Sequence, residues 1–365
     1  MAAVVVAVLA SVVVISYSGW WNPSNTESLA GRDPANAELY IDPDMQSIAA
    51  AREDARFDPI ATTPQAKWFT DWSTSETVQD DVGDYLDGAA AADAVPTVVL
   101  YRIPQRDCGS WSTGGAADEQ EYRDWVKGAA AELKGHDDAL VIIEPDALPQ
   151  LGKCEQGDRL DTLTFAVDAL ATTGARVYID AGHENWLSAA EAADRLSKVG
   201  VDKVRGFSLN VAAHYTTQRE IAYAEDVRSE LSKLGITDVH YVIDTGRNGA
   251  GPQGDNCNPP GARLGHEPQL FEGDALDGFL WVKNPGETDG ACRGGPASGF
   301  WAPAALDLLG LDQDERTSSQ LSAGWIRLGA VGGAGLVGLV AWALARRRTR
   351  DRLRGAAEHA ARQVP

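Results

Sequence analysis

Short runs of apolar, often β-branched residues recur along this chain, and a polar side chain follows directly after most of them. The runs include VPTVVLYRI, ALVII, ARVYI, GFSL, HYVI and GFLWV, and segments such as EQEYRDWVKGAAAELKG and TQREIAYAEDVRSELSKLG lie between them. Buried parallel strands joined by crossover helices have this pattern. We therefore predict an α/β fold, a distorted (β/α) barrel of parallel strands.

The polar residues that follow the apolar runs indicate where chemistry takes place. In a β/α barrel the C-terminal strand ends all point to one face, and this face carries the active site. The residues at or after the predicted strand ends are Asp107, Asp146, Asp180, Asn210, Asp244, Lys283, Glu287 and Asp289. Several carboxylates on one face suit acid/base hydrolysis of a neutral substrate, and glycosides are the leading candidates.

Length and charge narrow the classes of protein. The 365 residues allow one domain of about 250–300 residues plus appendages, and a core of that size folds without a metal or a disulfide. The net charge of −21 argues against a nucleic-acid partner, because phosphate binding needs clustered Lys and Arg. The six histidines are scattered without ligand spacing, so we expect neither a metal site nor a cofactor.

Four cysteines are present, and none forms a CxxC metal pair. Cys108 and Cys154 follow successive predicted strands, and Cys257 and Cys292 flank the last one. We therefore expect the disulfides Cys108–Cys154 and Cys257–Cys292, although sequence alone leaves all three connectivities of four cysteines open. Disulfides indicate an oxidising compartment.

An apolar run without charge, Ala2–Ile15, lies near the first residue. We interpret residues 1–20 as a signal peptide or N-terminal anchor and residues 21–38 as a linker, so we expect the protein to be exported. The basic n-region of a signal peptide and a convincing A-x-A cleavage site are missing. The alternatives are therefore an uncleaved anchor and a buried strand or helix.

A second apolar segment, residues 325–345, has Arg327 as its only charge and is long enough to span the hydrocarbon core of a membrane. The basic residues 346–365 follow it, and the positive-inside rule places them in the cytoplasm. We therefore predict a single-pass protein of the cell membrane, with a domain at 39–312 outside the cytoplasm and a linker at 313–324.

Several motifs occur in one order: KWFTDW, VLYRIPQRDCGSWSTGGA, VIIEPDALPQLGKC, VYIDAGHENWL, YVIDTGRNGAGP, CNPPGARLG and FLWVKNPGETDGAC. With this series the chain resembles glycoside hydrolase family 6, the inverting cellulases, over about Leu39–Leu311. One such motif is weak, but RDCG, EPD, DAGH-x-x-W and PGE-x-D in succession are highly specific. The resemblance implies a distorted β/α barrel with a cleft over the strand ends, the same two disulfides, and a β-glucan polysaccharide as the substrate.

The resemblance also implies roles for four carboxylates. Asp146 of EPD is expected to be the general acid that protonates the leaving oxygen, and Asp107 of RDCG its neighbour, whose charge raises the pKa of the acid. Asp289 of PGE-x-D is expected to be the base that acts on a water at the opposite face of the sugar. Asp180 of DAGH is expected to support this network.

Further positions are similar to the family's motifs. Tyr101 corresponds to the tyrosine beneath the distorted sugar at the cleavage point, and Ser112 to the serine of a mobile loop that helps to hold the water. The residues expected to contact the glucan are Trp68, Trp186 and Trp281 as stacking platforms, and Asn210, Lys283 and Glu287 as hydrogen-bonding partners.

The chain departs from the family pattern at two places. The segment after the fifth predicted strand reads Asn210-Val-Ala-Ala-His-Tyr215, where the family has N-x-S-N-Y. Ala291 is an extra residue before Cys292. The first departure puts subsite contacts in question, and the second can shift the loop that carries Asp289.

Other polar and aromatic residues keep structural interpretations. Asp244 is predicted to cap and turn the chain in DTGRNG, and His183 to be structural rather than catalytic. Trp20, Trp111 and Trp301 are predicted to be core residues, because a tryptophan without a motif is usually buried.

These observations favour a β-1,4-glucanase that acts outside the cell by single-displacement inversion. The segments from Asp146 to Asp180 and from Asp244 to Asp289 are short and leave no room for the long loops that roof the cleft of exo enzymes. We therefore predict endo action. The alternatives are an exo-acting cellobiohydrolase, a hydrolase of another β-glycan, and a non-catalytic surface glycan-binding protein.

Overall fold

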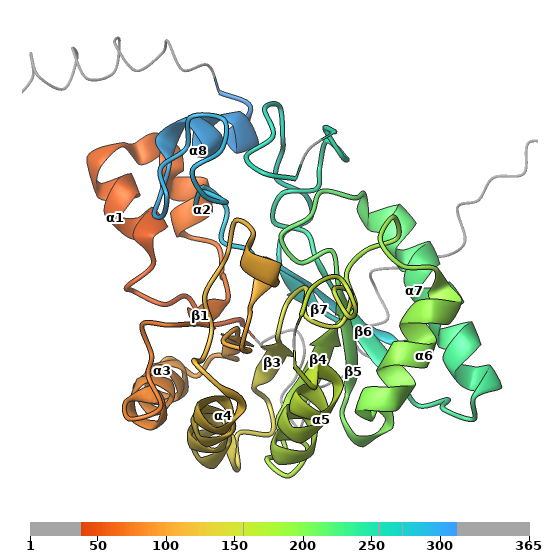
Figure 1. Cartoon of the computed structure of the whole chain (residues 1–365). Coiled ribbons are helices and arrows are strands. Elements are labelled where there is room, and N and C mark those ends of the chain that lie inside the picture. Colours follow the sequence, from red (N-terminus) through yellow and green to blue (C-terminus); the bar gives the residue numbers. More distant parts are fainter. Residues whose placement is uncertain (1–37, 156, 255, 272, 312–365) are drawn as a thin grey trace, which may run out of the picture. The chain divides into compact units, whose positions relative to one another are not determined.

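The computed structural model describes residues 38–155, 157–254, 256–271 and 273–311 (Figure 1). Its strands are β1 (Lys67–Phe69), β2 (Thr97–Leu100), β3 (Leu140–Ile143), β4 (Arg176–Asp180), β5 (Gly206–Leu209), β6 (His240–Asp244), β7 (Gln269–Leu270) and β8 (Leu276–Leu280). Its α-helices are α1 (Gln46–Glu53), α2 (Asp58–Ala61), α3 (Val78–Ala91), α4 (Glu119–Leu133), α5 (Arg159–Leu170), α6 (Ala189–Val199), α7 (Thr217–Lys233) and α8 (Ala302–Leu309). Short 3-10 turns are η2 (Ala55–Phe57), η3 (Asp107–Gly109) and η4 (Val201–Lys203).

One curled sheet contains the strands, in the order β1-β2-β3-β4-β5-β6-β8-β7. The pairs from β1 to β8 are all parallel, and β7 alone runs antiparallel, against β8. Parallel neighbours need a crossover, and α3 to α7 provide one between each pair of strands from β1 to β6. The predicted α/β fold with parallel strands is confirmed, whereas the two-residue β7 was not predicted.

The two faces of the curled sheet are covered differently. Side chains such as Val98 and Val141 belong to the apolar core shared with the crossover helices. Their strand neighbours Val99 and Ile142 belong to a second, smaller core that fills the inside of the curl. Alternation along each strand therefore produces two apolar layers, which explains why the strands read as continuous apolar runs.

Local sequence signals position the crossover helices. Asp118, Asp158 and Ser188 are N-caps of α4, α5 and α6, and each side chain accepts a hydrogen bond from the backbone N–H three residues on. Gly200 ends α6 in a left-handed conformation with φ of 89°, which costs glycine little. In Figure 1 these helices lie along one side of the strands, whereas α8 lies with α1 and α2.

The sheet does not close into a complete barrel over the described ranges, because no strand ladder joins β1 to β8. Single contacts bridge this seam. The Ala66 N–H donates to the Trp281 carbonyl over 3.0 Å. The Trp68 indole donates to the Val282 carbonyl over 2.7 Å. The predicted barrel is therefore a curled half-barrel with a seam between its outermost parallel strands.

Both predicted disulfides, Cys108–Cys154 and Cys257–Cys292, are confirmed. Each joins loops at the carboxyl ends of the strands: the first links the loops after β2 and β3, and the second links those after β6 and β8. The predicted membrane span at 325–345 and the predicted signal at 1–20 lie outside the described residues. Within the described part, none of the helices has the length and hydropathy to cross a bilayer.

Candidate active site

A cleft of about 890 Å³ opens at the carboxyl ends of the strands. Most of the residues predicted from the sequence to be functional line it: Trp68, Tyr101, Asp107, Ser112, Asp146, Trp186, Lys283, Glu287 and Asp289. They come from β1 and from the loops after β2, β3, β4 and β8, so the parallel sheet brings distant segments to one face.

Asp146 lines the cleft and lies three residues beyond Ile143, the last residue of β3. Its backbone has φ of 70°, which is rare for a residue other than glycine and is strained. Burial raises the pKa of the Asp146 carboxyl well above its ordinary value, and the negative charges of Asp180 and Asp107 raise it further. A hydrogen bond with the Tyr101 side chain opposes this shift. Asp146 is therefore protonated near neutral pH.

Asp180 supports Asp146 from below and is itself only 1% exposed. Its Oδ2 accepts the Asp146 N–H over 2.8 Å, and the Ser208 hydroxyl lies 3.4 Å from Oδ1. Burial raises the pKa of Asp180 to about 7, although the backbone and Ser208 hydrogen bonds lower it. Asp180 does not line the cleft, so it acts on Asp146 rather than on a substrate.

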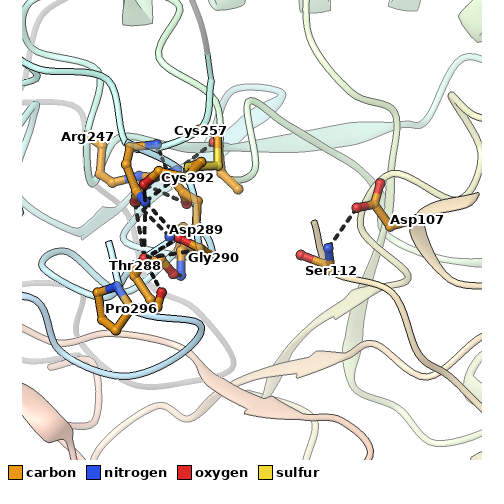
Figure 2. Close-up of a disulfide and its surroundings, with 12 residues drawn as sticks. Asp107, Ser112, Arg247, Cys257, Thr288, Asp289, Gly290, Cys292 and Pro296 are labelled. Atoms are coloured by element: carbon orange, nitrogen blue, oxygen red, sulfur yellow. Dashed lines mark hydrogen bonds and ion pairs between the residues drawn. A yellow bond between two sulfur atoms is a disulfide. The ribbon is translucent and has the colours of Figure 1, made fainter. Parts of the chain in front are cut away.

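Asp107 lies on the loop after β2, which the Cys108–Cys154 disulfide fastens to the loop after β3. Its Oδ1 accepts the Gln150 side-chain amide over 2.8 Å. Its Oδ2 accepts the Ser112 N–H over 2.9 Å, as Figure 2 shows. The carboxyl group is thus fixed near Asp146, whose pKa it raises.

Asp289 is held by Arg247 and by the segment next to the second disulfide (Figure 2). The Arg247 Nη1 donates to both carboxylate oxygens over 2.8 Å, and the Asn258 N–H donates to Oδ2 over 2.9 Å. Burial tends to raise the pKa of Asp289, but the charges of Arg247 and Lys283 and these hydrogen bonds hold it below its ordinary value. Asp289 is therefore ionised, in contrast to Asp146.

Lys283 and Glu287 lie beside Asp289 in the cleft wall. The Lys283 Nζ donates to the Thr288 carbonyl over 3.1 Å. Burial lowers the pKa of Lys283 and raises that of Glu287, while the attraction between opposite charges opposes both shifts. These groups offer a cation and a carboxyl for hydrogen bonds with sugar hydroxyls.

Aromatic side chains form part of the cleft wall. The Trp68 ring stands edge-on to Tyr101 with centroids 5.4 Å apart, and the Arg106 guanidinium lies 4.6 Å from the Tyr101 ring centroid. Trp186 lies 5.4 Å from His183 between ring centroids. Trp68 and Trp186 therefore present apolar rings to the cleft, where flat sugar faces can stack.

Two predicted sugar contacts have other partners in the structure. Asn210 is fully buried, and its side-chain amide donates to the carbonyls of Tyr215 and Asp244 over 3.1 and 2.9 Å. Trp281 is 3% exposed, and its indole donates to the His266 carbonyl over 2.9 Å. Neither lines the cleft, so the structure places both among the residues that shape the fold beneath it.

Asp244 fits its structural interpretation. Its two carboxylate oxygens accept four backbone N–H groups, from Ala212, Gly246, Val282 and Lys283, over 2.9 to 3.2 Å. This one side chain therefore ties together the loops after β5, β6 and β8.

Sequence reasoning missed several residues of the site. Arg247 was not singled out, although an ionised, buried Asp289 requires a cation beside it. Trp111 was expected in the core, but it is 61% exposed and lines the cleft. Trp72 is 52% exposed and lines the cleft as well. Its position four residues after Trp68 in KWFTDW is the signal that would have pointed to it.

The geometry defines a class of site: a buried, protonated carboxyl and an ionised carboxylate in one cleft with aromatic walls, as in acid/base glycoside hydrolysis. The family "Glycosyl hydrolases family 6" matches residues 32–307. The chain therefore belongs to glycosyl hydrolase family 6, as its motifs predicted. Over the described ranges, no three His, Cys, Asp or Glu side chains gather so that they could hold a metal ion.

Individual relatives agree with this assignment. Endoglucanase A of Cellulomonas fimi is 45% identical over 278 residues, which cover 74% of this chain and 60% of that protein. Endoglucanase A of Thermobispora bispora is 39% identical over 282 residues, covering 72% and 61%. The chain thus spans about 60% of the length of these two relatives.

A solved structure is also similar. The endoglucanase Cel6 from Mycobacterium tuberculosis, in complex with methyl-cellobiosyl-4-deoxy-4-thio-β-D-cellobioside, is 42% identical with a TM-score of 0.70. The match covers 75% of this chain and 97% of that chain.

Proposed function

We propose that the protein hydrolyses β-1,4-glucosidic bonds of cellulose or a related β-glucan, with inversion and at internal positions. One observation carries this proposal: Asp146 and Asp289 line the same cleft, and their surroundings shift their pKa values in opposite directions. An acid that keeps its proton and a base that has lost it are what single-displacement hydrolysis requires.

The reaction follows from these protonation states. The Asp146 carboxyl donates its proton to the glycosidic oxygen as the bond from that oxygen to the anomeric carbon breaks. A water attacks the anomeric carbon from the opposite face and loses a proton to Asp289. Inverting carboxyl pairs stand about 6.5–9.5 Å apart, which leaves room for this water. The products are a chain with an inverted anomeric hydroxyl and a chain with a free hydroxyl.

Neighbouring residues support this reaction. The charge of Asp107 favours the protonated form of Asp146 before the bond breaks. Tyr101 lies between Trp68 and Asp146, where a distorted sugar ring would rest. Ser112 lines the same cleft, its backbone N–H donates to Asp107, and its side chain hydrogen-bonds with Tyr101.

Two considerations support internal cleavage. The segment from Asp146 to Asp180 contains α5 and β4, which leaves no room in it for a long loop over the cleft. The similar proteins named above are called endoglucanases, a name that describes their own activity. The alternatives are a cellobiohydrolase that acts at chain ends, a hydrolase of another β-glycan, and a glycan-binding protein without turnover.

The test is a time course on carboxymethyl cellulose with the disulfide-intact domain, residues 39–312. Viscosity and new reducing ends are recorded together. A steep loss of viscosity with few new ends is the expected result. New ends with little loss of viscosity would mean exo action. If neither changes, while the protein still binds the polymer, the binding-protein alternative is correct.

We also propose that the domain works outside the cytoplasm, exported by residues 1–20 and anchored by a membrane helix at 325–345. The two disulfides support an oxidising compartment, and the basic residues 346–365 support a cytoplasmic tail. Protease added to intact cells should remove the domain and leave the tail protected. If a chain truncated before residue 313 remains in the membrane fraction, the prediction of a C-terminal anchor is wrong.

A further inference from the structure

His214 is a buried imidazole that the proposed reaction does not use. It is 1% exposed, and neither ring nitrogen has a hydrogen-bond partner among the described residues. Burial lowers the pKa of His214 to about 3, with a further decrease from the charge of Arg247, which Asp289 opposes. The ring is therefore neutral, with one N–H donor and one acceptor nitrogen. Leaving both unpaired in the interior is unfavourable.

Arg247 also has one buried nitrogen without a hydrogen-bond partner among the described residues. Its Nη1 holds Asp289, and its Nη2 donates to the Ala212 carbonyl over 2.6 Å. Its Nε lacks a partner within the described part of the chain. Because Arg247 is 5% exposed, bulk water does not reach this N–H freely. The guanidinium is thus fixed at two of its three nitrogens by protein groups.

A small cavity of about 20 Å³ adjoins both side chains. Asn258, Glu287 and Leu308 contribute to its wall as well. A cavity of this size holds one water molecule, and a buried water needs about two to four polar partners. The Arg247 Nε–H is a donor for such a water, and the unprotonated ring nitrogen of His214 is an acceptor.

We propose that His214 is a positioning residue for the Arg247–Asp289 pair and acts through a water bound in this cavity. The Arg247 Nε–H donates to the water oxygen, and the water donates to the unprotonated ring nitrogen of His214. The guanidinium is then held at all three nitrogens, and its Nη1 points at Asp289. This proposal deepens the proposed function, since it concerns the base of that reaction.

The position of His214 in the sequence agrees with this role. It lies in the Asn210–Tyr215 segment, where the chain departs from its family. The same segment provides the Ala212 carbonyl for Arg247, and Asp244 fixes it by accepting the Ala212 N–H. The departure therefore lies in the residues that surround Arg247, and its members Val211, Ala212 and Ala213 also line the cleft.

A crystal structure of the domain at high resolution gives the direct test. Density for one water within hydrogen-bonding distance of His214 and the Arg247 Nε is expected. A well-ordered cavity without such density would overturn the proposal.

The functional test compares His214→Phe with Leu308→Ala. The phenylalanine retains a planar ring but has no nitrogen, so the water loses its acceptor and Arg247 loses one restraint. The alanine changes the same cavity from α8 and removes no polar atom. We expect His214→Phe to raise the pKa of Asp289 by about one unit, which lowers kcat/KM about tenfold on the acid side of the pH profile. The Leu308→Ala profile should keep its midpoint while its Tm decreases.

A conservative variant and a second readout complete the test. His214→Asn restores an acceptor and should return the midpoint toward that of the parent. The Asp289 carboxyl titration, followed by carbon NMR in the folded protein, reports the same shift without any turnover. A parent that folds but does not cleave glucan would contradict the proposed function alone. An unshifted Asp289 titration in folded His214→Phe, or in His214→Leu if the phenylalanine variant does not fold, would contradict the role of His214.

Discussion

Replacing Asp180 by asparagine should make the protein more stable at neutral pH and less active. Asp180 is buried, and its pKa of about 7 lies about three units above that of an exposed aspartate. Below about pH 4 the folded and unfolded states both carry the protonated form, so the carboxyl costs nothing. As pH rises toward 7, only the unfolded state ionises freely, and the folded state loses up to about 4 kcal/mol of stability. Asparagine avoids this loss.

The hydrogen bonds of Asp180 allow this exchange. The Asp146 and Gly182 N–H groups both donate to Oδ2, which the asparagine oxygen can replace. The new amide group then faces the Ser208 hydroxyl, which can rotate to accept. Asp244 provides the matched control. Both of its oxygens accept two backbone N–H groups each, so Asp244→Asn places an amide donor against donors and should destabilise the fold.

The assay is urea unfolding of the parent and both variants at several values of pH between 4 and 7, together with a pH profile of kcat/KM. The gain in Asp180→Asn should grow with pH and vanish near pH 4. The alkaline limb of the kcat/KM profile of Asp180→Asn should move to lower pH. The substitution removes the Asp180 charge, which raises the pKa of Asp146 in the parent. A loss of stability at pH 7, or a gain that does not vary with pH, would refute the reasoning.

Three further predictions concern the cleft. Asp146→Asn should lower kcat/KM about 10²–10⁴-fold with KM little changed, and unaltered bond cleavage would remove the general-acid assignment. Arg247→Met leaves Asp289 buried without its cation and should destabilise the fold by about 3–5 kcal/mol near neutral pH, measured by urea unfolding. Because the pKa of Asp289 then rises, this loss should shrink as pH falls from the raised pKa in the variant to the lowered pKa in the parent, and a constant loss would contradict the ion-pair explanation. Trp72→Ala should raise KM about tenfold for long glucan chains and less for short oligosaccharides, whereas Leu234→Ala, which removes an exposed apolar side chain elsewhere, should leave both unchanged.

The strand ends could be predicted because parallel strands impose a simple rule. Continuous apolar runs mark strands buried on both faces, and the next polar residue emerges at the active face. Asp107, Asp146 and Asp289 were found in this way and by motif, and all three line one cleft. Cysteine spacing worked for the same reason, since the loops that carry the cysteines emerge side by side.

Side-chain partners far apart in the sequence could not be predicted, because the spacing of apolar residues contains no information about them. Arg247 lies in a turn, and only the folded chain brings it to Asp289, 42 residues away. The exposure of Trp281 and of Trp72 could not be predicted from the sequence either. A tryptophan directly after β8 turns into the fold beneath the cleft, whereas one beyond the end of β1 stays exposed at the cleft. Their exposed fractions depend on the curl of the sheet, which the sequence pattern does not specify.

The seam between β1 and β8 has a consequence for hydrogen exchange and for substrate protection. A strand ladder opens cooperatively, but a few isolated contacts open at a lower free energy, so the Ala66 amide should exchange faster than the amides of β3. Trp68 is part of both the seam and the cleft. Its indole N–H donates a hydrogen bond across the seam, and its ring forms part of the cleft wall. A glucan stacked on that ring binds the closed seam preferentially and should slow its opening in proportion to occupancy. Binding of the proposed glucan substrate should therefore stabilise the seam of this sheet.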